Sequence, residues 1–376
     1  MTDSCDACFR RAHLLGRLSE RIAGLLDHPQ RRAAGLLALS NDELIAAVAP
    51  DRVESLRAFV EGFDPVAARE HLHGAGVEAV CRHRDAYPAG LHDLTDPPAA
   101  VFVRGGGRRL AELTQQPLVT IVGTRRPSPY GTEVARELGR SLAVAGVPVI
   151  SGLALGIDGA AHRGVLDADG AGIAVLACGP DVIYPRTHRA LYERLLDRGV
   201  VLSELPPGQR ALKWSFPARN RIMAALGATT IVVEAADRSG TLITAAFATT
   251  LNRDVGAIPG RVTARMAAGS NRLLRDGAHV VRGVEDVLDL LYGVGVRPAA
   301  ETAGCGGEEG AGRRSEELEP GLRRVLDAVE AGQGVETLVE AALASAREVR
   351  VALGRLEALG LVTRDGFGSY ERTALA

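Results

Sequence analysis

The sequence has no long hydrophobic run and no apolar leader. Every uninterrupted apolar stretch is shorter than the roughly 18 residues that indicate a membrane-spanning helix. The N-terminus, MTDSCDACFRRAHLLGRL, carries charges where a signal peptide has its apolar segment. These absences argue against a membrane or secreted protein, and they predict a cytoplasmic protein with no membrane partner.

Cysteine is scarce, and its number is odd. The five cysteines show no framework spacing, so reduced thiols are favoured over disulfides. Cys5 and Cys8 form one CxxC pair, and no second pair of this kind follows in the sequence. Two ordinary thiols are the favoured interpretation of this pair, and a metal site is the alternative.

Catalytic signatures are missing as well. The sequence has no HExxH motif, no GxSxG elbow and no cluster of metal ligands at a recognisable spacing. A P-loop is also excluded, because it needs Gly-Lys-Ser/Thr and the only lysine, Lys213, lies between Leu212 and Trp214. We therefore predict that the protein is not an enzyme and has no cofactor.

The chain does contain enough apolar residues for two or three domains. It has 376 residues, of which 46% are apolar and 24% are charged. The formal net charge is only −2, but residues 208–276 hold ten basic and four acidic residues, a local net charge of +6. Such an excess attracts a polyanion, although a scattered, solvated surface is the alternative.

Apolar patterning divides the chain into four parts. Residues 1–75 are expected to form a helical domain, because apolar residues recur at spacings of three and four. In 76–295, strand-like runs alternate with helical segments, which predicts an α/β domain with a doubly wound, mostly parallel sheet. Residues 296–317 are too poor in apolar residues to fold and are expected to be a linker. Residues 318–376 indicate a winged helix, and a net charge of −4 over 316–376 favours a protein partner over DNA.

Six strands and five helices are expected in the α/β domain. The strands are predicted at 118–122, 147–150, 173–177, 200–202, 229–233 and 255–258. The helices are predicted near 130–145, 157–168, 187–198, 217–226 and 241–251. Ligands of such sheets bind beyond the carboxyl ends of the strands, so the loops at those ends are the candidate site.

The first of these loops contains arginines where a dinucleotide-binding protein has glycines. The run LVTIV ends at Gly123 and continues as Thr124-Arg125-Arg126-Pro127. A guanidinium at Arg125 can bind phosphate oxygens in a bidentate manner, which favours a fixed polyanion over NAD. The alternative is an arginine that only packs against the sheet.

Two further loops have small or hydroxyl residues before a helix. One begins at Ser151-Gly152 and leads to Asp158 and His162, and the other contains Ser239-Gly240-Thr241. Unpaired amides at a helix N-terminus bind anions. Asp158 could instead interact with the helix dipole, and His162 is equally compatible with a core position.

Between these loops lies Lys213-Trp214-Ser215-Phe216-Pro217-Ala218-Arg219-Asn220-Arg221, which combines cations with two aromatic rings. Exposed bases of single-stranded nucleic acid stack on rings while their phosphates meet cations. This pattern favours a single strand over a duplex, and core packing of at least one ring is expected.

The order and spacing of five motifs resemble the DNA-processing protein A (DprA, also called Smf) family. These motifs are GTRRPSPYG, SGLALGIDGAAH, FPARNRIMAAL, EAADRSGTLITAAFA and AIPGRVTARMAAGSNRLLRDGA. The resemblance implies an extended Rossmann-like fold that binds single-stranded DNA, usually as a homodimer, and loads the RecA recombinase during natural transformation. It also implies accessory domains at both ends, of which the N-terminal one would be SAM-like or helix-hairpin-helix-like, although a clear hairpin signal is missing.

The resemblance also assigns candidate DNA-binding residues. Six match positions that line the DNA pocket of the family: Arg125, Lys213, Phe216, Ser151, Gly152 and Ser239. Four more belong to the same motifs: Asn220, Arg221, Gly240 and Thr241. The alternative function is a nucleotide-processing enzyme of the related phosphoribohydrolase group, in which a glutamate such as Glu234 would assist cleavage. A shorter glycine run in this chain weakens that alternative.

Overall fold

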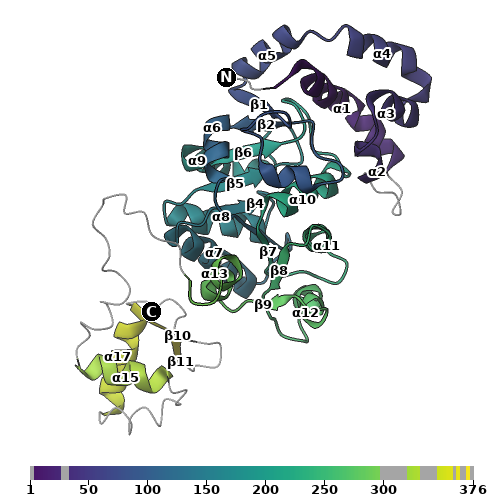
Figure 1. Cartoon of the computed structure of the whole chain (residues 1–376). Coiled ribbons are helices and arrows are strands. Elements are labelled where there is room, and N and C mark those ends of the chain that lie inside the picture. Colours follow the sequence, from purple (N-terminus) through teal and green to yellow (C-terminus); the bar gives the residue numbers. More distant parts are fainter. Residues whose placement is uncertain are drawn as a thin grey trace. The chain divides into compact units, whose positions relative to one another are not determined.

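The computed structural model describes residues 4–26, 34–296, 320–330, 345–358, 361–364 and 370–372. The chain divides into two compact units, Met1–Ala300 and Glu301–Ala376 (Figure 1). The helices near the N-terminus and the large sheet belong to the same unit. The linker predicted at 296–317 lies outside the described residues except for Val296, so its conformation stays a prediction.

The first unit is built around a sheet of nine strands in the order β1-β2-β6-β5-β4-β3-β7-β8-β9. The strands are β1 (Val77–Cys81), β2 (Ala100–Arg104), β3 (Val119–Val122), β4 (Val149–Ser151), β5 (Gly172–Val175), β6 (Val200–Ser203), β7 (Thr229–Val232), β8 (Asp254–Ala257) and β9 (His279–Val280). Neighbouring strands from β6 to β9 are parallel, whereas β2 is antiparallel to both β1 and β6. The six predicted strands are all present, and β1, β2 and β9 extend the sheet.

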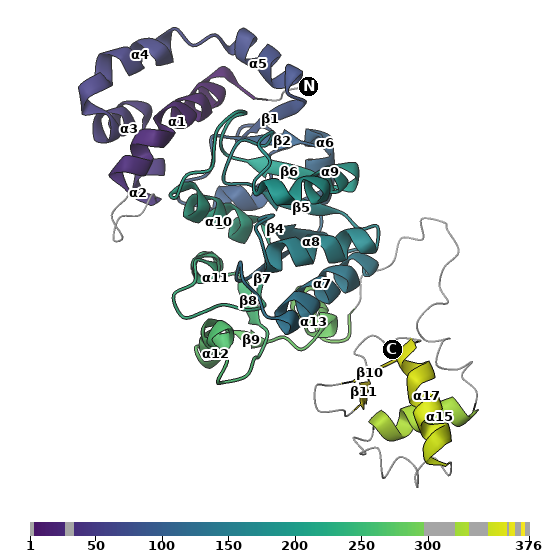
Figure 2. The same cartoon turned by 180° about the vertical axis from the view of Figure 1, so that it is seen from behind.

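Helices cover both faces of this sheet. One face carries α6 (Gly107–Leu113), α10 (Ser215–Leu226), α11 (Thr241–Thr250) and α12 (Ala268–Arg275), and the other carries α7 (Pro129–Val144), α8 (Ile157–Asp167), α9 (Arg189–Arg198) and α13 (Val284–Tyr292). Val149 and its neighbour Ile150 therefore pack into different cores. Burial on both faces explains why the strands are continuous apolar runs instead of alternating patterns. Figure 2 shows α7 and α8 side by side.

The strand order reverses at β3. From β3 the chain continues to β4, β5 and β6 on one side, and it then returns to β7 on the other side. Such a reversal leaves a crevice at the carboxyl ends of the strands, where ligands of α/β proteins bind. The loops after β3, β4 and β7 leave the sheet at this end because the three strands are parallel.

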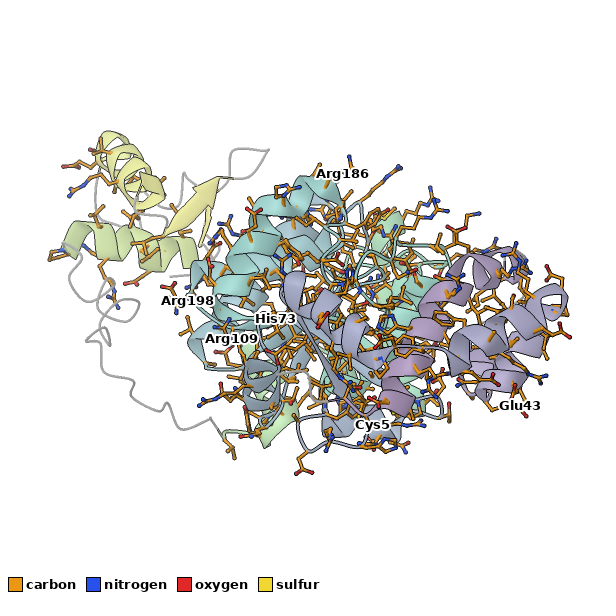
Figure 3. The ribbon with its side chains drawn as sticks, turned by 90° about the horizontal axis from the view of Figure 1, so that it is seen from above. Cys5, Glu43, His73, Arg109, Arg186 and Arg198 are labelled. Atoms are coloured by element: carbon orange, nitrogen blue, oxygen red, sulfur yellow. The ribbon has the colours of Figure 1, made fainter. Side chains whose placement is uncertain are left out.

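The N-terminal helices pack against the sheet and α10. They are α1 (Asp6–Leu25), α2 (Ala34–Leu37), α3 (Asn41–Val48), α4 (Val53–Glu61) and α5 (Pro65–Gly74). A capping box between Ser40 and Glu43 begins α3, and Glu43 is labelled in Figure 3. Short 3₁₀ turns lie at Pro50–Arg52, Ala89–Asp93, Arg186–His188 and Arg265–Ala267.

The second unit contains two described helices and a two-stranded sheet. These are α15 (Pro320–Glu330), α17 (Ala346–Ala358), β10 (Val362–Arg364) and β11 (Tyr370–Arg372), and the two strands are antiparallel. Leu326, Leu353 and Leu356 belong to its apolar core. The other residues of the winged helix predicted at 318–376 lie outside the described residues. Within the described parts of both units, no helix is long and apolar enough to cross a membrane.

Candidate nucleic-acid interface

A pocket of about 240 Å³ lies at the carboxyl ends of β3 and β7. The loop after β3 and the first turns of α10 and α11 form its walls. Six of the ten candidate residues line it: Arg125, Phe216, Asn220, Ser239, Gly240 and Thr241. Motifs that lie more than one hundred residues apart in the sequence therefore meet at one site.

The wall of the pocket contains an arginine stacked on an aromatic ring. The guanidinium carbon of Arg125 lies 4.6 Å from the centre of the Phe216 ring. Arg125 is exposed and Phe216 is half-buried. Tyr184, in the loop after β5, lies on the same ring with a centroid distance of 5.8 Å and is 46% exposed. A cation and two rings at a pocket edge can contact both a phosphate and a base.

The opposite wall is the start of α11. The Ser239 hydroxyl accepts a hydrogen bond from the Thr241 amide at 3.2 Å, and its oxygen lies 3.0 Å from the Thr241 hydroxyl. Asn220 of α10 donates to the Gly240 carbonyl at 3.2 Å and so connects the two helices. The first turn of α11 has no acidic residue, so no side chain of this turn offsets the positive end of the helix dipole at the pocket.

Gly152 lies beneath the pocket and accommodates a buried arginine. Arg219 donates to the carbonyls of Gly152 at 2.8 Å and Val175 at 2.6 Å. A Cβ atom on Gly152 would lie only 1.8 Å from Nη1 of Arg219, so a larger residue would have to displace the buried guanidinium. Burial lowers the pKa of Arg219, and the nearby Asp158 carboxylate acts in the opposite direction.

Asp158 balances the positive charge of Arg219 at the floor. Its carboxylate accepts a hydrogen bond from the Gly152 amide at 3.1 Å. Burial raises the pKa of Asp158, and the charge of Arg219 acts in the opposite direction. The buried pair holds the loop after β4 in place, whereas the positive charge of Arg125 lies at the solvent side of the pocket.

Four candidate residues lie outside the pocket lining, namely Gly152 beneath it and Ser151, Lys213 and Arg221. Ser151 is fully buried, and its hydroxyl donates to the Ile121 carbonyl at 2.7 Å. Lys213 is exposed and precedes α10 by two residues. Arg221 is 1% exposed and forms ion pairs with Asp96 at 3.0 Å and Glu204 at 2.8 Å. Burial alone would lower the pKa of Arg221, but its two carboxylate partners raise it.

Trp214 and His162 belong to the core. Trp214 is 5% exposed, packs with α1, and donates from its indole nitrogen to the Ser19 carbonyl at 2.9 Å. His162 is completely buried, and burial lowers its pKa to about 4. The His162 imidazole is therefore neutral near pH 7. Of Trp214 and Phe216, the two rings of the basic segment 213–221, only Phe216 lines the pocket.

Glu234, the residue on which the enzyme alternative depends, is engaged in holding the first loop. It is 6% exposed and accepts a hydrogen bond from the Ser128 amide at 2.9 Å and another from the Ser128 hydroxyl. Ser128 in turn caps α7 by accepting from the Gly131 amide. Both carboxylate oxygens thus have structural partners, and Glu234 does not line the pocket.

Sequence comparison assigns the chain to a family. The family model for DNA recombination-mediator protein A matches residues 78–292, more than half of the chain. The chain belongs to the DprA/Smf family. Protein Smf of Synechocystis is 33% identical over 309 residues, which cover 76% of this chain and 78% of the relative. A DNA processing protein DprA of Mycobacterium tuberculosis is 41% identical over 306 residues, with coverages of 80% and 73%.

Two solved DprA structures share the fold of this family member. DprA from Streptococcus pneumoniae has a TM-score of 0.59 at 29% identity and covers 76% of this chain and 98% of its own. DprA from Helicobacter pylori, whose structure describes a single-stranded DNA binding mode, has a TM-score of 0.51 at 30% identity. That match covers 56% of this chain and 93% of the other.

The sequence did not predict a contribution of Tyr184 to the site, nor the roles of Arg219 and Asp158 beneath the pocket. Tyr184 lies in a loop with no strand or helix pattern, so nothing in its surroundings marks it. Arg219 is two residues from Arg221 in ARNR, and the sequence does not show which arginine lies beneath the pocket. The side chains of Arg219 and Arg221 point in nearly opposite directions, because an α-helix rotates by about 200° between residues i and i+2.

Proposed function

We propose that the pocket binds the backbone of single-stranded DNA. The observation that carries the proposal is the exposed guanidinium of Arg125, held on the Phe216 ring at the mouth of a pocket that also receives the α11 N-terminus. A single strand offers phosphates to the cation and unpaired bases to the rings. The single-stranded DNA binding of the Helicobacter pylori relative supports this assignment.

Each candidate residue has a distinct role in the proposal. Arg125 and Lys213 bind phosphates, and the Ser239 to Thr241 turn supplies hydroxyl and amide donors. Because Arg125 covers one face of Phe216, a base must displace the guanidinium or stack beside Tyr184. Asn220, Ser151 and Gly152 keep the walls and floor in position, while Arg221 acts through the fold and makes no DNA contact.

Binding measurements on labelled oligonucleotides test the proposal. The protein should prefer a single strand to a blunt duplex, and log affinity should fall with log salt by about 0.7 per phosphate neutralised. Equal affinity for the two DNA forms would contradict it. Incubation with nucleoside monophosphates tests the phosphoribohydrolase alternative, which requires release of free base; a non-enzymatic protein releases none.

We further propose that the bound strand is passed to the RecA recombinase, as the DprA resemblance implies for natural transformation and recombination. The chain has no P-loop, so it can hold a strand but cannot drive ATP-dependent exchange. On DNA coated with a single-strand-binding protein, adding the chain should shorten the lag before RecA hydrolyses ATP. An unchanged lag with intact DNA binding would refute this loading role.

The proposal also includes an oligomeric state, a location and the assignment of two domains. We expect a homodimer in the cytoplasm, with an extended Rossmann-like domain at 76–295 and a winged helix at 318–376. Two helices and an antiparallel pair of strands support the winged helix. Its acidic character favours a protein contact over DNA. Light scattering of the purified chain tests the dimer.

A further inference from the structure

A second group of reactive side chains comes from residues that precede all the pocket-lining residues in the sequence. Cys5 and Cys8 come from the start of α1, Cys81 ends β1, and His83 follows in the next turn. One ligand atom of each residue lies within 4.8 Å of all the others. Figure 3 marks Cys5. The CxxC pair therefore has two further partners, and they arrive as Cys-x-His about 75 residues later.

Two distances within this group are close to those of tetrahedral coordination. Zinc binds thiolate sulfur at about 2.3 Å and imidazole nitrogen at about 2.0 to 2.1 Å, so ligand atoms lie about 3.5 to 3.8 Å apart. Nδ1 of His83 is 3.4 Å from the sulfur of Cys5 and 3.4 Å from that of Cys8. The backbone amide of Cys5 also donates to the sulfur of Cys81 at 3.3 Å, a contact common around metal-bound thiolates.

The surroundings are buried and apolar on the side of Cys8 and Cys81, whereas Cys5 is half-buried and His83 is exposed. Cys8 and Cys81 are 3% and 0% exposed, and they belong to an apolar cluster with Phe9, Leu72 and Phe102. A buried thiol cluster without a metal gains little from placing three sulfurs and an imidazole together, whereas a metal binds all four. Three cysteines also cannot all be paired with one another in disulfides.

We propose that Cys5, Cys8, Cys81 and His83 bind one zinc ion as a Cys₃His site that fastens the start of α1 to the end of β1. Three sulfurs and one imidazole form a ligand set of structural zinc, and with four protein ligands no position remains for a substrate. The ion would close a loop of 76 residues, from Cys5 to Cys81, and hold the helical region on the sheet.

Metal analysis of the full chain, purified without chelators, tests the proposal. About one zinc per chain is expected, and Cys8→Ser should lose nearly all of it. Cys178→Ser is the matched control, because Cys178 is also buried but lies in a different core, with its sulfur near the Val182 carbonyl. His83→Cys should keep the zinc, since a fourth thiolate can replace the imidazole.

Cobalt supplies a second readout, which reports the ligands of the metal ion directly. Co²⁺ added to the chelator-treated chain should give a thiolate-to-metal charge-transfer band and the intense visible bands of a tetrahedral ion. Absence of both bands and of zinc in folded wild-type protein would overturn the proposal. So would a Cys5–Cys8 or Cys5–Cys81 disulfide in the native chain, seen as a mass two hydrogens lower.

Discussion

At the residue scale, neighbouring arginines in one loop should behave differently. Arg125→Ala should weaken single-stranded DNA binding by roughly 1.5 to 3 kcal/mol, about 10- to 150-fold, because it removes a charged hydrogen bond to phosphate. The slope of log affinity against log salt should also fall by about 0.7. Fluorescence anisotropy over a salt series measures both quantities.

Arg126→Ala is the matched control for this change. Arg126 is exposed in the same loop, and within the described residues its guanidinium stacks on no aromatic ring. Its removal should alter affinity less than that of Arg125 and leave the melting temperature unchanged. If the two variants lose affinity equally, the loop acts as a diffuse basic surface and the stacked guanidinium has no special role.

His162 should make stability depend on pH. Burial lowers its pKa from 6.5 to about 4, so the unfolded chain takes up the proton first as the pH falls. Its contribution to the free energy of unfolding is complete above about pH 6.5 and is lost toward pH 4, at about 1.4 kcal/mol per pH unit. Urea unfolding at several pH values should show a shallower dependence for His162→Gln. An unchanged slope would mean that other groups dominate.

At the element scale, the start of α7 depends on Glu234. Glu234→Gln should lower the free energy of unfolding by about 1 to 3 kcal/mol, because an amide leaves one of the Ser128 donors without an acceptor. Thermal or urea unfolding measures the loss. Glu133→Gln is the control, since Glu133 is exposed on the same helix. Unchanged stability together with a lost base-release activity would instead favour the phosphoribohydrolase alternative.

Strands and helices could be read from the sequence because burial is strong and local. The predicted strand 229–233 is observed as Thr229–Val232, and the predicted helix 241–251 as Thr241–Thr250. A short run of β-branched residues bounded by Gly227 and Glu234 has few other structures available. β1, β2 and β9 were harder to predict, because edge positions and long-range pairing are set by contacts and not by local pattern.

The candidate site was predictable only in part, and for the same reason. Loops after parallel strands share an edge, so Arg125, Ser239 and Thr241 could be grouped from the sequence. The sequence of α10 does not show which arginine faces the pocket and which pairs with carboxylates. The two carboxylates, Asp96 and Glu204, come from other segments of the chain. Cys81 and His83 could not be grouped with the CxxC pair for a similar reason, because about 75 residues separate them in the sequence.

At the scale of the whole molecule, we expect the first unit to bind single-stranded DNA without the second unit. A chain ending at residue 300 should bind single-stranded DNA as tightly as the full chain, or slightly more tightly, because residues 316–376 carry a net charge of −4. Its salt slope should be the same. Anisotropy titrations of both chains measure this, and a smaller slope for the shorter chain would place phosphate contacts in the second unit.

The fluorescence of the Trp214 indole reports on the contact between α1 and the start of α10. The chain has one tryptophan, so its emission reports a single place, where the ring is buried and donates to the Ser19 carbonyl. Phe216 lies two residues further along the same helix. Strand binding at the pocket and metal removal at the far end of α1 can thus be followed in one spectrum: a red shift signals water reaching the junction, and quenching without a shift signals DNA nearby.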